Sequence, residues 1–255
     1  MVTSLIAERH SYLRRSIADY CRQTYPNREL VLVLDRANAE TRARIASELS
    51  TFARSDIRIV EPKGELSLGA LRNVSVDAAR GSILCQWDDD DFHHPLRIER
   101  QLGALIDTGS HAVCLEESMH FFIRERQLYC LNWRATEAKS LPGTLLCQRE
   151  APFRYPESGE FSRLGEDFAV ALRLQECGFH ALAGEPHLYV YVNHGANSWG
   201  DAHHRMLAEK LSLSRALLKR RERELRAGLA PFDFGPGEIA VEGYNGTAFI
   251  LYQSS

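Results

Sequence analysis

The segment Ser82-Ile83-Leu84-Cys85-Gln86 is followed at once by Trp87-Asp88-Asp89-Asp90-Asp91, and this junction is the most informative part of the chain. The first segment is mostly apolar and predicts a buried strand, so the carboxylates stand at the end of a core strand. Alternate side chains of a strand share a face, so we expect Asp88 and Asp90 to point the same way. Two carboxylates placed so can hold one divalent cation. The junction therefore suggests a site for a metal-bound diphosphate.

The acidic run also has a plainer interpretation, because most such runs in soluble proteins are solvated surface. Its position argues against that interpretation. Like charges beside a core strand repel one another and lose hydration, and a bound cation offsets both costs. The position of the run, more than its composition, favours a metal site.

The composition of the whole chain limits its class. With 255 residues it can form one large α/β domain with a small appendage, and we expect a domain over 1–200 and an extension over 201–255. A net charge of -3 and a pI near 6.4 give no reason to expect nucleic acid as a partner. The six cysteines are scattered without a CxxC pair, which is typical of a reduced, cytoplasmic protein without structural zinc.

No segment of the sequence predicts a membrane span or a secretion signal. No window approaches the roughly 18 consecutive apolar residues that a span needs. The first residues, 2–6, indicate a strand and not a leader. We therefore expect a protein that is neither secreted nor integral to a membrane.

Strand-like runs alternate with helical patterns from residue 2 to about 116, which predicts a parallel sheet built from βαβ units. The expected strands are 2–6, 30–34, 57–60, 82–86 and 112–115, with a helix after each of the first four. The pattern then changes, because 119–123 and 128–133 flank a polar tetrapeptide and predict an antiparallel hairpin. A mixed sheet follows, with a later helix at 166–177 and a strand at 187–192.

Residues 203–225 predict one amphipathic helix. Its apolar stripe consists of Leu207, Leu211, Leu218 and Leu225. Basic residues on the remaining surface are diluted by glutamates, so packing on the domain or on a partner subunit is favoured over a peripheral membrane contact. A homo-oligomer is one way to cover the stripe. The short apolar runs in 231–255 indicate no role.

Several further segments stand in a fixed order along residues 2–200. They are Tyr12 to Ile17, Gln23 to Asn27, Gly69 to Asn73, Ala78 to Gly81, the acidic run with Pro95 and Arg97, Gly165-Glu166-Asp167, and His194 with Asn197-Ser198. Together they resemble the family 2 glycosyltransferases, which transfer a sugar from a nucleotide-sugar donor. The resemblance implies an α/β, GT-A-like fold: a mixed central sheet of the Rossmann-like nucleotide-binding kind, flanked by helices and followed by a C-terminal helical extension.

The resemblance implies a donor site around the acidic run. In the family an Asp-x-Asp motif binds Mg²⁺ or Mn²⁺ together with the ribose and diphosphate of the donor, which corresponds here to Asp88 and Asp90. Asp91 is the common extra acid of the family, and Asp89 is counted with Asp88 among the residues that contact the donor. The cation offsets the charge that develops on the departing nucleoside diphosphate.

Three other residues are expected near the donor nucleotide. Asp35 follows the apolar strand 30–34 and corresponds to the acid that contacts the base, although Asp is also a favoured turn residue. Arg72 and Asn73 stand where the family has an Arg-Asn pair near the donor. The guanidinium of Arg72 could pair with the diphosphate or with a nearby surface carboxylate.

The resemblance also supplies residues for the chemical step. Glu166-Asp167 corresponds to a Glu-Asp pair at a helix start, where a carboxylate removes the proton of the acceptor hydroxyl. We assign the base to Asp167, with Glu166 as its nearest substitute, although the helix dipole alone could explain an acidic pair there. His194 would complete the metal site or bind the diphosphate. Trp199 could border the acceptor site.

The sequence departs from the family pattern in two places. Residues 6–10 are shorter than the usual segment after the first strand and lack its Pro-Thr pair. Leu34-Asp35-Arg36 replaces two adjacent acids and a Gly-Ser turn. Both segments contact the nucleotide base in the family, so the identity of the base stays open.

These features predict an inverting, metal-dependent glycosyltransferase that moves a sugar from a nucleotide-diphosphate sugar to an acceptor hydroxyl in polysaccharide or glycoconjugate biosynthesis. A non-catalytic nucleotide-binding scaffold of the same fold is the first alternative, which the altered segment 6–10 favours. A sugar-phosphate nucleotidyltransferase is the second, which the lack of glycine in 7–11 disfavours. The acceptor stays open among a saccharide, a lipid-linked sugar, a peptide and a metabolite.

Overall fold

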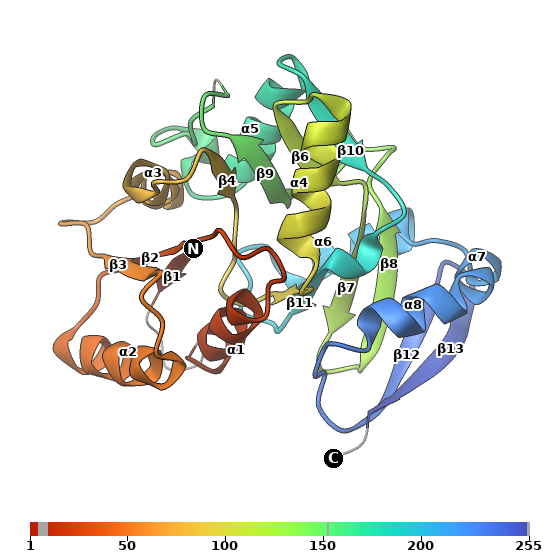
Figure 1. The fold of residues 1–255 in the computed structure, drawn as a ribbon. Coiled ribbons are helices and arrows are strands. Elements are labelled where there is room, and N and C mark those ends of the chain that lie inside the picture. The colour runs from red at the N-terminus through yellow and green to blue at the C-terminus, as the bar shows by residue number, and fades with distance from the viewer. Residues whose placement is uncertain (5–9, 152, 254–255) are drawn as a thin grey trace.

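Strands and helices alternate at the start of the chain in the predicted order (Figure 1). The structure, a computed structural model, describes residues 1–4, 10–151 and 153–253, so the departure from the family pattern at 6–9 lies outside the described residues. Parallel strands β1 (Val2–Ser4), β2 (Leu30–Asp35) and β3 (Ile57–Val60) form a first sheet in the order β1-β2-β3. The helices that follow them are α1 (His10–Cys21), α2 (Ala39–Phe52) and α3 (Leu68–Ala78).

Both faces of the first sheet are covered, which explains the continuous apolar run in β2. Leu32 and Leu34 pack with residues of α1 and α2, whereas Val31 and Val33 pack with Leu71 of α3 on the other face. Because successive side chains of a strand alternate between faces, a strand covered on both sides has to be apolar throughout. The carboxyl end of β2 then places Asp35 at the edge of the sheet, opposite Ser4 of β1.

A second sheet has the strand order β10-β6-β9-β4. Its strands are β4 (Ile83–Cys85), β6 (Ala112–Leu115), β9 (Leu141–Gln148) and β10 (Phe179–Leu182), with β9 antiparallel to its neighbours β4 and β6. α4 (Arg97–Thr108) packs through Leu105 on one face, and α5 (Glu166–Gln175) packs through Val170 and Leu174 on the other. α4 ends at Gly109 in the left-handed conformation, as its sequence predicts.

A third sheet has the strand order β13-β12-β8-β7-β11-β5. The predicted hairpin is confirmed as β7 (Glu117–Phe122) and β8 (Gln127–Asn132), and the expected late strand is β11 (Tyr189–Asn193). β5 (Phe92–His93) pairs with β11, so the acidic run is the link that carries the chain from β4 in the second sheet to β5 in the third. Short 3₁₀ helices occur at Glu160–Ser162 and Pro186–Leu188.

The prediction of a single helix over 203–225 is wrong. The structure has α6 (Asp201–Leu211), α7 (Arg215–Arg220) and α8 (Glu222–Leu229) in its place. Between α6 and α7 the main chain is extended, where the amide of Leu213 donates to the carbonyl of Cys130 in β8 and the side chain of Ser214 caps α7. The capping residue of a helix has a non-helical backbone, so α6 cannot continue through Ser214 into α7. The apolar spacing of the sequence nevertheless continues across this serine.

The last part of the chain completes the third sheet. β12 (Gly237–Gly243) and β13 (Gly246–Gln253) form a hairpin, and β12 pairs in parallel with β8. Leu218, Leu225 and Leu229, from α7 and α8, lie in one apolar cluster with residues of this hairpin. Leu218 and Leu225 of the apolar stripe are therefore covered within the chain, whereas Leu207 and Leu211 of α6 are partly buried against another cluster of the same sheet. Within the described ranges, no helix has the length and apolar character needed to cross a bilayer.

Gly69 of α3 offers a direct test of how this helix packs. A Cβ atom at this position would lie 1.9 Å from the main-chain oxygen of Pro156, a contact that forces the backbone to move. We expect Gly69→Ala to lower the free energy of unfolding by about 1–3 kcal/mol, measured by urea denaturation. The control is Gly103→Ala in α4, where a Cβ meets nothing within 4 Å and helix propensity should raise stability by up to about 1 kcal/mol. Equal stability of the wild type and Gly69→Ala would contradict the close approach of α3 to the segment at Pro156.

Candidate active site

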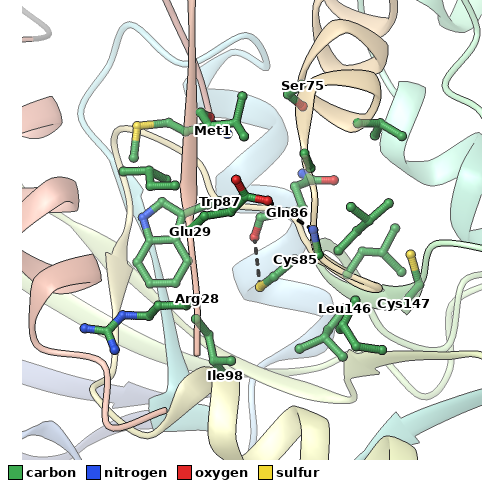
Figure 2. Close-up of a pocket in the computed structure, with 18 of the residues that line it drawn as sticks. Met1, Arg28, Glu29, Ser75, Cys85, Gln86, Trp87, Ile98, Leu146 and Cys147 are labelled. Atoms are coloured by element: carbon green, nitrogen blue, oxygen red, sulfur yellow. Dashed lines mark hydrogen bonds between the residues drawn. The ribbon is translucent and has the colours of Figure 1, made fainter. Parts of the chain in front are cut away.

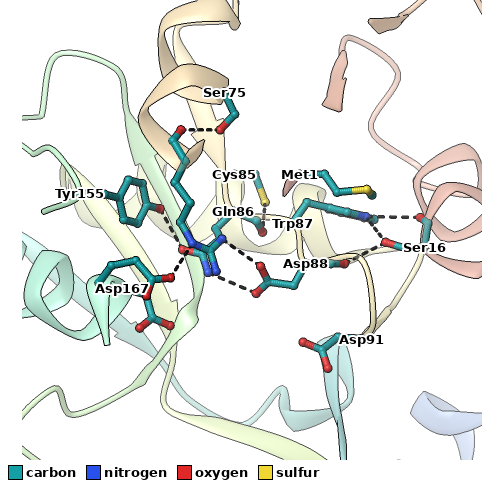
Figure 3. A network of polar contacts seen from close by, with 12 residues as sticks. Met1, Ser16, Ser75, Cys85, Gln86, Trp87, Asp88, Asp91, Tyr155 and Asp167 are labelled. Carbon is teal, nitrogen blue, oxygen red and sulfur yellow. Dashed lines mark hydrogen bonds and ion pairs between the residues drawn. The ribbon is translucent and has the colours of Figure 1, made fainter. Parts of the chain in front are cut away.

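The main chain of the acidic run is held from two sides at the carbonyl oxygen of Asp88. This oxygen accepts hydrogen bonds from Ser16 Oγ of α1 and from His93 Nε2 of β5, each at 2.9 Å. The indole of Trp87 stacks on the His93 ring with centroids 3.8 Å apart. Its Nε1 donates to Ser16 Oγ, as Figure 3 shows. The start of the run is thereby fixed between α1 and the third sheet.

Arg97, at the start of α4, is fully buried beneath the run. Its Nη2 donates to the carbonyl of Gln86 at 2.9 Å, and its Nη1 donates to His93 Nδ1. Burial is the largest cause, and the nearby charge of Arg97 the second largest, that lowers the pKa of His93 well below its ordinary value. His93 is therefore neutral, with its proton on Nε2, which makes it the donor to Asp88.

Asp88 and Glu166 share one guanidinium. Arg72 Nη1 lies 2.9 Å from Asp88 Oδ1, and Arg72 Nε lies 2.7 Å from Glu166 Oε1. The second oxygen of Asp88 accepts from Gln86 Nε2 at 3.2 Å. Burial acts to raise the pKa of Asp88, but the charge and hydrogen bond of Arg72 outweigh it, so this pKa lies below its ordinary value. Asp88 is therefore ionised and oriented.

The charge of Asp167, the neighbour of Glu166 in the chain, is compensated only in part by this arrangement. Its Oδ1 accepts from the amide of Phe168 at 2.8 Å. Burial, followed by the charge of Glu166, raises its pKa from 3.8 to about 7, although Arg72 partly opposes the rise. Figure 3 shows Asp88, Tyr155 and Asp167 around one polar network. A carboxyl group with a pKa near neutrality is suited to accept a proton.

Asp90 lies beside His194. Their Oδ2 and Nε2 atoms are 3.1 Å apart, and the His194 side chain is almost entirely buried. The pairing of β5 with β11 explains this contact, because it places the end of the acidic run next to the end of β11. Asn197 shapes the turn that follows, since its Oδ1 accepts from the amide of His194 and its Nδ2 donates to the carbonyl of Val192.

The two remaining acids of the run have structural contacts. Asp89 accepts from Thr3 Oγ1 of β1 and is buried. Asp91 accepts from the amide of Val192 at 2.7 Å and from the hydroxyl of Tyr189. Burial and the neighbouring carboxylate of Asp90 raise the pKa of Asp91 well above its ordinary value. These contacts attach the run to the first and third sheets.

The expected shared face of Asp88 and Asp90 is not observed. Residues 89–91 form a bend and not a strand, because the chain turns there from the second sheet to the third. Asp88 consequently contacts Arg72 and Gln86, whereas Asp90 contacts His194. Strand alternation applies only where the backbone stays extended.

Of the other residues predicted for the site, Asn73 is connected to this centre, whereas the partners given for Asp35 and Trp199 lie outside it. Asn73 donates to the carbonyl and accepts from the amide of Tyr155, whose hydroxyl donates to Gln86 Oε1, so Asn73 supports the centre through Tyr155. Asp35 is paired with Arg36. Trp199 is 42% exposed and stacks on His203.

The roles of Gln86, Ser16, His93 and Tyr155 were not recognised from the sequence. Gln86 carries a signal that could have been used, because it is a polar residue that ends an apolar run two positions before the first acid. Tyr155 carries none, since its contact with Gln86 joins residues 69 positions apart. Only the folded chain brings these side chains together.

A cavity of about 510 Å³ lies beside this centre, between the first sheet and β4 (Figure 2). Its walls include Glu29, Cys85, Trp87 and Leu146. Asp88, Asp90 and Asp167 are not among its lining residues. We therefore place the candidate active site at the carboxylates and not in this cavity.

Comparisons with known proteins show which family and which fold this chain is similar to. Residues 6–130 match the model of glycosyl transferase family 2. An uncharacterized glycosyltransferase of Methanocaldococcus jannaschii is 34% identical over 103 residues, which is 40% of this chain and 34% of the relative. EpsE of Bacillus subtilis, assigned as a glycosyltransferase, is 28% identical over 187 residues, which is 69% of this chain and 66% of the relative. The chain thus spans between one third and two thirds of the lengths of these two relatives.

Solved structures confirm the fold. TarS 1–349 of S. aureus superposes with a TM-score of 0.57 at 13% identity over 89% of this chain and 72% of that chain. The mannosyltransferase PcManGT of Pyrobaculum calidifontis gives 0.56 at 16% identity over 90% and 62%. The fold is the predicted GT-A fold. The match over residues 6–130 and the curated relatives together support a family 2 glycosyltransferase.

The raised pKa of Asp167 predicts a dependence of stability on pH. The folded state binds this proton more tightly than the unfolded state, because the pKa rises from 3.8 to about 7 on folding. The stabilisation from Asp167 is therefore complete below pH 3.8 and is lost as the pH rises through about 7. We expect the free energy of unfolding of the wild type to fall relative to Asp167→Asn across this range, measured by urea denaturation. A constant difference between the two proteins would show that Asp167 has an ordinary pKa.

Proposed function

We propose that this protein is an inverting, metal-dependent glycosyltransferase that uses a nucleotide-diphosphate sugar, with Asp167 as the catalytic base. The observation that carries the proposal is the carboxyl group of Asp167, whose pKa is raised to about 7 beside the ionised Asp88. Glu166 is a weaker candidate for the base, because its carboxylate is buried and bonded to Arg72.

The proposed reaction is one displacement. Asp167 accepts the proton of the acceptor hydroxyl while that oxygen attacks the anomeric carbon of the donor sugar. The bond from the anomeric carbon to the diphosphate breaks, and the bonding electrons leave with the nucleoside diphosphate. Attack opposite the departing group inverts the anomeric carbon. Asp88, held by Arg72 and Gln86, is proposed to contact the donor.

Asp90 and His194 are the proposed protein ligands of a divalent cation, Mg²⁺ or Mn²⁺. Their Oδ2 and Nε2 atoms are 3.1 Å apart, so the two side chains would be close enough to hold one cation together. Among the described residues, no group of three or more His, Cys, Asp or Glu side chains could hold a metal ion. A cation bound here would take its other ligands from the diphosphate and water, and would offset the charge of the leaving group.

The structural neighbours bear on the donor in a limited way. TarS was solved with UDP-GlcNAc, and PcManGT was solved with GDP-Man and Mn²⁺. Two different bases occur on this fold, so the fold alone does not determine the base used by this chain. A role in polysaccharide or glycoconjugate biosynthesis and a cytoplasmic location stay predictions, and the acceptor is open.

The assignment of Asp167 as the base predicts a loss of turnover. We expect Asp167→Asn to lower kcat by at least about 100-fold, because the variant cannot accept the proton. The assay measures release of UDP or GDP from UDP-GlcNAc and GDP-mannose with Mn²⁺, with and without a panel of acceptors. In the wild type, kcat/KM should rise with pH up to about 7, where Asp167 loses its proton.

Asp107→Asn, at an exposed position of α4, is the control and should retain full activity. Wild-type turnover by folded Asp167→Asn would refute the assignment.

The assignment of Asp90 as a metal ligand predicts a change in binding. Calorimetry should show that Mn²⁺ strengthens binding of the nucleoside diphosphate to the wild type and that EDTA abolishes this gain. In Asp90→Asn the gain should be lost, because an amide is a weaker ligand for a hard cation than a carboxylate. An undiminished effect of Mn²⁺ in Asp90→Asn would exclude Asp90 from the metal site. Nucleotide binding without turnover by the wild type, for every donor and acceptor in the panel, would favour a scaffold.

A further inference from the structure

Gly143 lies at the point where three polar side chains of the candidate active site converge. It belongs to β9, which runs between β4 and β6. A Cβ atom on Gly143 would lie 3.4 Å from Asp88 Oδ2, 3.6 Å from Gln86 Nε2 and 3.7 Å from Asp167 Oδ2. These atoms come from the end of β4 and the start of α5, on both sides of the proposed reaction centre.

The backbone does not explain why this residue is glycine. Gly143 is not among the glycines with positive φ, so an L-residue could adopt its conformation. The nearest atoms are ends of side chains at ordinary contact distances, so an added methyl group would not collide with main chain. Glycine weakens a strand and often marks a place where a ligand approaches closely. Without a side chain, a methyl-sized space is left beside the carboxyl groups of Asp88 and Asp167, because a Cβ atom would only reach van der Waals contact with them.

The chemistry around this space suits a sugar ring. Asp88 Oδ2 can accept a hydrogen bond from a hydroxyl group, and the amide of Gln86 can donate one to a hydroxyl oxygen. The space lies between Asp88, which we assign to the donor, and Asp167, which we assign to the acceptor hydroxyl. In a displacement reaction the transferred sugar lies between these two groups.

We infer that Gly143 is a specificity-determining residue, against whose Cα the transferred sugar of the donor packs. The inference rests on the proposed function and deepens it, because it assigns this space to the sugar and not to the nucleotide. A side chain at position 143 would occupy the volume of the sugar ring while leaving the nucleotide contacts in place.

A chain of buried hydrogen bonds holds this space at a fixed width. Gln101 Nε2 of α4 donates to the carbonyl of Thr144, the residue after Gly143, at 2.7 Å. Arg97 Nε donates to Gln101 Oε1 at 3.0 Å, and the same guanidinium donates to the carbonyl of Gln86. β9 and the segment that carries Gln86 are thus both attached to α4. The space beside Gly143 is preorganised for its ligand.

The test compares binding of nucleotide sugars with binding of bare nucleotides. Calorimetry with Mn²⁺ measures UDP-GlcNAc, GDP-mannose, UDP and GDP on the wild type, Gly143→Ala and the control Gly103→Ala. We expect Gly143→Ala to bind the nucleoside diphosphate as the wild type does, and to bind the nucleotide sugar at least about tenfold more weakly. The control should match the wild type for every ligand. Turnover of the nucleotide sugar should fall in Gly143→Ala alone.

Two results would overturn the inference. One is unchanged binding and turnover of the nucleotide sugar in Gly143→Ala, and the other is an equal loss of nucleoside diphosphate and nucleotide sugar. If Gly143→Ala does not fold, judged by near-ultraviolet circular dichroism, the wild type is examined by NMR with Mg²⁺ and UDP-GlcNAc or GDP-mannose. A nuclear Overhauser effect between the α protons of Gly143 and the sugar ring is then expected, and its absence would overturn the inference. A wild type that binds nucleotides and fails to bind or turn over either nucleotide sugar would count against the proposed function itself, and the inference would fall with it.

Discussion

The guanidinium of Arg72, shared between Asp88 and Glu166, is the interaction on which the candidate active site depends. Buried charges are costly unless they are paired, and each of the two carboxylates lies within 3 Å of this one cation. The pairing orients Asp88 and occupies Glu166. Asp167 then remains as the carboxyl group whose charge is poorly compensated, and its pKa is raised to about 7. One buried arginine thereby distinguishes a fixed carboxylate from a group that can exchange a proton.

A second constraint is the path of the acidic run. It connects β4 of the second sheet with β5 of the third, and its first carbonyl is bonded to Ser16 and His93. The bend that this path requires directs Asp88 toward Arg72 and Asp90 toward His194. The run therefore offers two separate groups to one donor: Asp88 near the proposed base, and Asp90 as a proposed metal ligand.

Much of the fold could be predicted from the sequence, because apolar periodicity is a local signal. The buried run of β2, the hairpin of β7 and β8, and the start of α5 at Glu166 all follow from it. The same signal failed at 203–225, where the apolar spacing continues across Ser212 and Ser214 although hydrogen bonds to β8 break the helix. Tertiary contacts outweighed a pattern that the sequence could not distinguish from one long helix.

The site was predicted less completely than the fold. The structure brings together Arg72, Asp88, Glu166 and Asp167, and separately Asp90 and His194, but the partner of each residue depends on contacts between distant segments. Arg72, for which a diphosphate and a nearby surface carboxylate were both open as partners, contacts the carboxylates of Asp88 and Glu166. The convergence of three side chains on Gly143 had no signal in the sequence, because it depends on the order of the strands in the second sheet.

The most direct test of this account is the pKa of the Asp167 carboxyl group, measured by carbon NMR in the wild type and in Arg72→Met. The account predicts a pKa of about 7 in the wild type and a higher pKa in the variant, because the charge of Arg72 lowers it. Asp167→Asn identifies the resonance, and near-ultraviolet circular dichroism shows whether Arg72→Met is folded. An ordinary pKa in the wild type, or the same pKa in both folded proteins, would contradict the claim that Arg72 controls the charge of the proposed base.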